Sequence, residues 1–148
     1  MEKLTHTDES GKAVMVDIGS KEIQYRSAKA TGHIRLAEGT LKLIAENLIH
    51  KGDVLTVAQI AGINAAKGTS GLIPLCHNIT LDHIRVNLFP DESGIVAESE
   101  VKCTGRTGAE MEALTAVTVA LLTVYDMCKA VDKMMVLDRI MITEKNKK

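Results

Sequence analysis

Aromatic side chains are almost absent from this sequence of 148 residues, which has no tryptophan and only Tyr25, Tyr125 and Phe89. So few rings exclude a stacking platform for nucleobases as a binding surface. The core must therefore consist of Ile, Leu, Val, Met and Ala. Because a small aliphatic domain buries a limited fraction of its surface, we expect the chain to form an oligomer.

The chain also lacks an excess of charge of either sign and lacks long apolar runs. The net charge is −1, and acidic and basic residues are interspersed, which excludes the basic footprint of a nucleic-acid-binding protein. No apolar run approaches membrane-spanning length, and the polar N-terminal residues do not resemble a signal peptide, so we expect no membrane partner. The odd count and wide spacing of Cys76, Cys103 and Cys128 argue against a disulfide framework and favour a reducing cytoplasm.

The hydrophobic pattern predicts strands and helices in one domain that spans residues 1–148. Alternation predicts strands at 23–33, 79–89, 95–103 and 136–143, while helical spacing predicts helices at 37–53, 56–67 and 109–135. A loop is expected at 68–71, a flexible segment at about 1–13 and a solvated tail at about 144–148. This order favours an α+β fold with a mainly antiparallel sheet and helices packed on one face.

The first predicted strand has one face of small residues. Ala28, Ala30 and Gly32 share a parity with Arg26. Small side chains leave room for another element to approach the backbone closely.

The stretch "SGLIPLCHNIT" contains the adjacent residues Cys76 and His77. Adjacent side chains on a strand point to opposite faces, and structural zinc sites usually have ligands at wider spacings, so a zinc site is disfavoured. A nucleophile and its base are usually distant in sequence, which also disfavours a Cys-His pair. The residues by themselves favour a buried Cys76 and a hydrogen-bonded His77 in an ordinary loop.

The stretch "TGRTGAEME" permits two interpretations. A turn with two glycines and Arg106 before a helix could present free N–H groups to a phosphate. Glu110 and Glu112 would equally be stabilised in the first turn of that helix. The sequence does not decide between an anion site and a helix start with acidic residues.

Asp126 and Lys129 are three residues apart and therefore share a helix face. An exposed ion pair is the usual interpretation of such spacing. However, alanines crowd this helix, and a lysine in an apolar site can lose its proton and act as a base beside an aspartate.

Glu112 lies fourteen residues before Asp126, within roughly 40° of the same face but about 21 Å along the axis. The two carboxylates therefore serve different purposes, or a symmetric dimer brings them together.

Several segments together resemble the MoaC family of molybdenum cofactor biosynthesis, over most of the chain. They are "MVDI", the R-x-A-x-A-x-G pattern from Arg26 to Gly32, "KGD" at Lys51, "AAKGTSGLIPLCH", and "GAEMEALTAV" running into "YDMCKAVDK". The resemblance implies a ferredoxin-like fold and a homohexamer of three dimers with active sites at the dimer interfaces.

The resemblance also implies an enzyme, a lyase that releases pyrophosphate. Its substrate would be (8S)-3',8-cyclo-7,8-dihydroguanosine 5'-triphosphate, supplied by a radical SAM enzyme, and its product cyclic pyranopterin monophosphate. No cofactor and no dedicated metal site are expected, and any magnesium would accompany the triphosphate.

Functional residues are transferred from the family by position. The catalytic residues would be Asp126, Lys129 and Lys51. The substrate-binding residues would be Leu75, Cys76, His77, Met111 and Glu112, with Glu110, Arg26, Lys67 and Asp17 as further polar positions of the pocket. His77 would bind substrate or relay a proton, whereas nothing marks Cys76 as reactive.

The chain departs from the family pattern on both sides of the binding loop. Gly68 and Gly71 stand where the family commonly has a basic and an acidic residue, and "NITL" replaces a proline-rich run after His77. Two other classes remain open: a nucleotide-binding regulatory subunit without chemistry, and a structural oligomer in which Asp126 and Lys129 form only a subunit contact.

Overall fold

The computed structural model describes residues 6–148. Four strands form one antiparallel sheet in the order β2-β3-β1-β4. The strands are β1 (Gln24–Arg35), β2 (Leu81–Pro90), β3 (Gly94–Gly105) and β4 (Val136–Lys147). With helices after β1 and β3, this order is the ferredoxin-like arrangement expected from the sequence.

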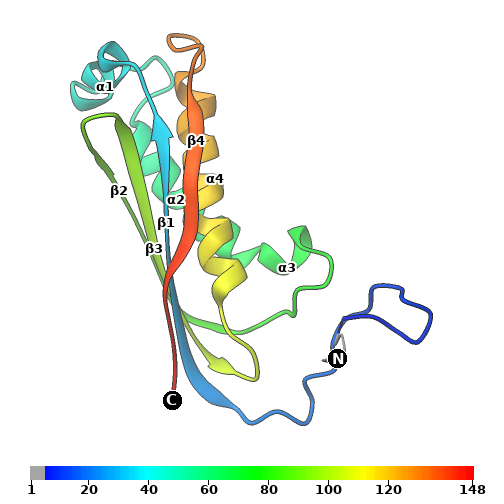
Figure 1. The fold of residues 1–148 in the computed structure, drawn as a ribbon. Helices are drawn as coiled ribbons and strands as arrows, with labels where there is room; N and C mark the ends of the chain where they lie inside the picture. Colours follow the sequence, from blue (N-terminus) through cyan, green and yellow to red (C-terminus); the bar gives the residue numbers. More distant parts are fainter. Residues whose placement is uncertain (1–5) are drawn as a thin grey trace.

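The helices are α1 (Glu38–Ala45), α2 (Val54–Lys67), α3 (Thr69–Leu72) and α4 (Glu110–Cys128). α2 and α4 lie side by side on one face of the sheet, and α4 runs along most of its length (Figure 1). The expectation of helices on one face is thus confirmed. The loop predicted at 68–71 is instead largely the short helix α3.

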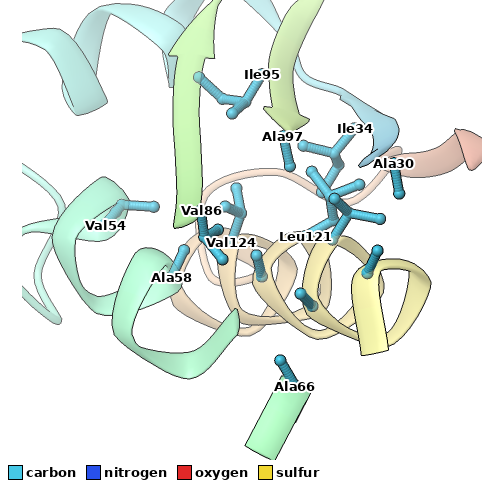
Figure 2. Packing of buried hydrophobic residues seen from close by; sticks show 14 of the residues in the cluster. Ala30, Ile34, Val54, Ala58, Ala66, Val86, Ile95, Ala97, Leu121 and Val124 are labelled. Atoms are coloured by element: carbon cyan, nitrogen blue, oxygen red, sulfur yellow. The ribbon is translucent and has the colours of Figure 1, made fainter. Parts of the chain in front are cut away.

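The core between the sheet and the helices is aliphatic, as the lack of aromatics predicted. Figure 2 shows Leu121 and Val124 of α4 between the helix and the sheet, with Val54 and Ala58 on the inner side of α2. All buried hydrophobic residues of the described chain are alanine, valine, isoleucine, leucine, methionine or cysteine.

The small-residue face of β1 is what lets α4 approach the sheet. Ala28 and Ala30 are buried, and a Cβ added at Gly32 would lie 2.8 Å from the Leu121 side chain. Such a distance is far inside van der Waals contact, so a side chain at position 32 would have to displace Leu121.

α1 ends earlier than the sequence pattern suggested. Asn47 takes a left-handed conformation with φ 53, and the Leu48 N–H donates to the Leu43 carbonyl while the Asn47 N–H donates to that of Ile44. This is a Schellman motif, in which asparagine can replace glycine. Lys51 therefore lies on the α1–α2 loop.

The C-terminal residues also differ from the prediction. The predicted tail from about residue 144 is part of β4, which pairs with β1 and places Lys147 opposite Arg26. Pairing with β1 supplies backbone hydrogen bonds that composition does not reveal. Of the predicted flexible segment, residues 1–5 lie outside the described residues, and Thr7 pairs with Ala13 in an isolated bridge.

One helix of the described chain, α4, is long and apolar enough to cross a membrane by length and composition. Half of its apolar window is buried inside the fold. The core helix of a soluble protein meets the same criterion, so α4 is accounted for by its place on the sheet.

Candidate functional site

The predicted site residues fall into two groups at opposite ends of α4. Asp126 is in the last turn of this helix and Glu112 in its first turn, at the orange and yellow ends of α4 in Figure 1. Fourteen residues of helix correspond to about 21 Å. Within one chain, a small substrate therefore cannot contact both carboxylates.

The first group, which we call the Asp126 cluster, consists of Lys51, Asp126 and Lys129. Lys129 Nζ lies 2.9 Å from one Asp126 carboxylate oxygen, and Lys51 Nζ lies 3.0 Å from the other. Lys51 also donates to the Asp126 backbone carbonyl at 3.2 Å. Hydrogen bonds from Lys129 and then Lys51 hold the pKa of Asp126 below its ordinary value. Asp126 is thus an ionised carboxylate between two lysines.

The Asp126 cluster is open to solvent in the single chain. The side chains of Asp126 and Lys129 are 55% and 57% exposed. The sequence pattern suggested that Ala113, Ala116, Ala120 and Ala130 bury this pair. The first three are buried but lie further back along α4, and Ala130, beside the pair, is exposed. An apolar environment for Lys129 is therefore not present in one chain by itself.

The second group surrounds Glu112, which is only 3% exposed. The Cys76 thiol is 3.8 Å from one of its carboxylate oxygens, and the other, Oε2, has no hydrogen-bond partner among the described residues. Burial raises the pKa of Glu112 above its ordinary value. A buried oxygen without a partner is available to a ligand, because buried polar groups are normally satisfied.

Cys76 and His77 engage different partners. The His77 ring nitrogen Nε2 contacts the backbone carbonyl of Val16 in the N-terminal segment, whereas Cys76 faces Glu112. The two side chains therefore do not converge on one ion. Burial, and then the neighbouring Glu112, raise the pKa of the Cys76 thiol, which disfavours the reactive thiolate.

A polar cleft of about 470 Å³ lies beside the start of α4. Its charged lining consists of Lys21, Arg26, Arg106, Lys145 and Lys147 together with the carboxylates of Glu22 and Glu110. Five cations against two carboxylates favour an anionic ligand. Lys21, Lys145 and Lys147 were not predicted from the sequence. Lys145 and Lys147 were missed because residues 144–148 were interpreted as a solvated tail, and no motif marked Lys21.

The helix start itself is occupied by a side chain. The carboxylate of Glu110 lies over Gly108, where it would clash with an added Cβ, and forms an ion pair with Lys145. Burial disfavours ionisation of Glu110, but the hydrogen bond from Lys145, a backbone hydrogen bond and the charges of Lys145 and Arg26 together outweigh it, so its pKa is lowered. In the "TGRTGAEME" stretch, an acidic first turn thus lies directly beside a cleft lined with cations.

The remaining predicted residues are exposed and lie toward the same end of the fold. Leu75 and Met111 are 41% and 37% exposed, and Lys67, at the end of α2, and Asp17 are also exposed. Asp17 accepts a hydrogen bond from the Gly19 N–H. α3 and the chain that follows it run past the start of α4 in Figure 1.

The two glycines that depart from the family pattern are not required by the backbone. A Cβ at Gly71 would meet nothing within 4 Å, and one at Gly68 would make only ordinary contact at 3.5 Å. Side chains could be accommodated at both positions, so lack of space does not explain these two glycines.

Residues that could bind a metal do not gather in the part of the chain that the structure describes. No group of three or more His, Cys, Asp or Glu side chains there is placed to hold an ion. The polar clusters instead contain lysine, arginine and carboxylate groups, which bind anions and transfer protons.

The fold and the two groups define an α+β protein equipped to bind an anionic small molecule and to carry out acid–base chemistry on it. The chain belongs to the MoaC family, whose model matches residues 15–148.

The chain is similar in sequence, over nearly its whole length, to several proteins with an assigned function. A cyclic pyranopterin monophosphate synthase of Chloroflexus aggregans is 52% identical over 98% of this chain and 89% of its own length. One of Magnetococcus marinus is 51% identical over 99% of this chain and 91% of its length. The mitochondrial cyclic pyranopterin monophosphate synthase of Arabidopsis thaliana is 55% identical over 90% of this chain and half of its own length.

Proposed function

We propose that this chain is a cyclic pyranopterin monophosphate synthase. It would convert (8S)-3',8-cyclo-7,8-dihydroguanosine 5'-triphosphate to cyclic pyranopterin monophosphate and pyrophosphate, in molybdenum cofactor biosynthesis. The observation that carries the proposal is the Asp126 cluster, in which Lys51 and Lys129 from separate segments contact one carboxylate. Membership of the MoaC family supplies the substrate class.

The first chemical requirement is to bind a triphosphate. The cations of the cleft beside α4, above all Arg26 and Arg106, would neutralise the phosphate oxygens, with Lys67 from the end of α2 as a further cation. When a ribose hydroxyl attacks the α-phosphorus, the new P–O bond closes the cyclic phosphate and the bond to pyrophosphate breaks. Positive groups already in place stabilise the charge that moves to the leaving group.

The second requirement is proton transfer during ring opening and reclosure. Lys51 and Lys129 place their amines within hydrogen-bond distance of the Asp126 carboxylate. Such an assembly can give and take protons at neighbouring substrate atoms. The ring system of the substrate would contact the residues around the start of α4 and the preceding loop, which are Glu110, Met111, Glu112, Leu75, Cys76 and His77. Asp17 would lie nearby.

The third requirement is to bring the two groups together. Because about 21 Å of α4 separates Glu112 from Asp126, we propose that two chains in a dimer each contribute one group to a shared site. Three dimers would form a hexamer. The enzyme would act in the cytoplasm and take its substrate from a radical SAM GTP cyclase.

The deciding experiment supplies the cyclised GTP derivative to purified protein and measures pyrophosphate and pyranopterin together. We expect one of each per substrate consumed, with specific activity lost at concentrations where the oligomer dissociates. Substrate binding without pyrophosphate would instead indicate a regulatory subunit. Absence of any thermal protection by the substrate would indicate a structural oligomer. Lys42→Ala, which removes an exposed lysine of α1, is the control variant.

A further inference from the structure

Asp132 is a buried carboxylate that the proposed chemistry does not use. It lies in the α4–β4 loop, three residues after Lys129, and is 6% exposed. Its own N–H donates to the Cys128 carbonyl at 3.1 Å and so extends the last turn of α4. A buried carboxylate normally requires partners, and those of Asp132 lie in a different part of the chain.

Two of the three hydrogen-bond partners of Asp132 are at the start of α1. One carboxylate oxygen, Oδ2, accepts the Ala37 N–H at 2.8 Å and the Thr40 hydroxyl at 2.9 Å, while Oδ1 accepts the Met134 N–H at 3.2 Å. Burial raises the pKa of Asp132, but the hydrogen bonds from Ala37, Thr40 and Met134 outweigh it, and the net shift is downward. Both oxygens of this buried carboxylate therefore accept hydrogen bonds from the protein.

These hydrogen bonds hold the start of α1, a helix that has no side-chain cap of its own, against the α4–β4 loop. The N-cap residue of α1 is Ala37, whose methyl side chain cannot accept a hydrogen bond. The free N–H groups of a helix start need an acceptor, which is usually a side chain at the N-cap itself. Here the acceptor comes from Asp132, 95 positions along the chain.

The hydrogen bonds between Asp132 and the start of α1 connect two segments of the chain. One segment leads to Lys51 and the other begins at Lys129, and both lysines belong to the Asp126 cluster. Lys51 follows α1 by six residues, and Lys129 is the C-cap of α4 directly before the Asp132 loop. Moving α1 away from this loop would draw Lys51 away from Asp126, whereas Lys129 would stay beside Asp126 at the end of α4.

We propose that Asp132 is a positioning residue for the reaction, whose hydrogen bonds to Ala37 and Thr40 hold the segments of Lys51 and Lys129 in register around Asp126. The inference rests on the proposed function only for its kinetic test. It assigns Asp132 no contact with substrate.

The kinetic test compares Asp132→Ala with Asp132→Asn. The alanine variant removes the acceptor, and we expect kcat to fall about 10- to 100-fold with KM changed less than threefold, since small misplacements of catalytic groups reduce rates on this scale. The asparagine variant retains one carbonyl oxygen for Ala37 and Thr40, so we expect it to keep kcat within about threefold.

Thr40 provides a second test on the partner side. Thr40→Val removes the hydroxyl at similar volume, whereas Thr40→Ser keeps it, so only the valine variant should lose kcat. If the effect passes through the Asp132 hydrogen bond, Asp132→Ala combined with Thr40→Val should be no slower than Asp132→Ala alone. Val86→Ala, which removes buried methyl groups of β2, controls for general destabilisation.

A measurement that needs no turnover separates this inference from the proposed function. The pKa of the Asp126 carboxyl, followed by carbon NMR with labelled aspartate, should be below its ordinary value in the wild type and in Asp132→Asn. In Asp132→Ala it should rise as Lys51 moves away from the carboxylate. This result would support the positioning role even if the wild type released no pyrophosphate.

Two results would overturn the proposal. One is an Asp132→Ala protein that is folded by circular dichroism, keeps wild-type kcat and leaves the pKa of Asp126 unchanged. The other is a loss of kcat in Asp132→Asn, or in Val86→Ala, as large as that in Asp132→Ala. The first would make Asp132 irrelevant to the cluster, and the second would attribute the loss to charge or to general destabilisation.

Discussion

Lys51 Nζ lies 3.0 Å from Asp126 Oδ2, although 75 positions separate the two residues in sequence. The contact joins the α1–α2 loop to the last turn of α4. Together with the ion pair between Asp126 and Lys129 at 2.9 Å, it assembles two cations on one carboxylate at the surface of the chain. The cluster is therefore placed where a second chain or a substrate can cover it.

Replacing Lys129 by alanine should abolish turnover and leave the fold intact. General acid–base groups contribute about 10²- to 10⁴-fold to rate, so we expect a loss of this size in kcat. The free energy of unfolding should hardly change, because exposed ion pairs contribute little. Pyrophosphate release and a thermal melt measure the two effects. Full activity in Lys129→Ala would refute the assignment of this residue.

Replacing Glu112 by glutamine should stabilise the protein at neutral pH. The pKa of Glu112 is raised by burial, so the folded wild type binds a proton more tightly than the unfolded chain. Stability from this group is present below the unfolded value of about 4.5 and is lost as pH rises through the folded pKa. Glu112→Gln should thus show a higher Tm at pH 8, with the difference shrinking toward pH 4. An equal difference at both pH values would contradict this account.

The Cys76 thiol should react slowly with alkylating reagents. Burial and the neighbouring Glu112 raise the pKa of this thiol, which leaves little thiolate at neutral pH. We expect iodoacetamide to modify Cys76 more slowly at pH 7.5 than it modifies a model peptide thiol, with faster labelling in Glu112→Gln. Mass spectrometry of timed samples measures the rates. Rapid labelling of the wild type at neutral pH would be inconsistent with this environment.

Adding a methyl group at Gly32 should destabilise the fold. Its Cβ would lie 2.8 Å from the Leu121 side chain and 3.1 Å from that of Ile140, and overpacking of this kind costs about 1–3 kcal/mol. Gly39→Ala is the matched control, because its Cβ would meet nothing within 4 Å in helix α1. There the change should stabilise by about 0.5–1 kcal/mol. Urea denaturation measures the free energy of unfolding of both variants. A Gly32→Ala protein as stable as the wild type would contradict the prediction.

Local patterns were sufficient for most of the fold. The small-residue face of β1 predicted a close approach, and α4 supplies it through Leu121. Helical spacing predicted α4 itself, although the helix ends at Cys128 instead of continuing to residue 135. The early end of α1 had a signal in Asn47, which was not recognised as a C-terminal cap.

The sequence by itself determined the family and the alternation of strands and helices, and it separated Glu112 from Asp126 by a fixed length of helix. These properties depend on residue order and on helix geometry, which are local. Only the tertiary structure decided which distant residues meet: Lys51 with Asp126, Asp132 with Ala37, and Lys145 with Glu110. Those contacts depend on how the α1–α2 loop, the α4–β4 loop and the β1–β4 pairing are oriented, and no periodicity along the chain records that orientation.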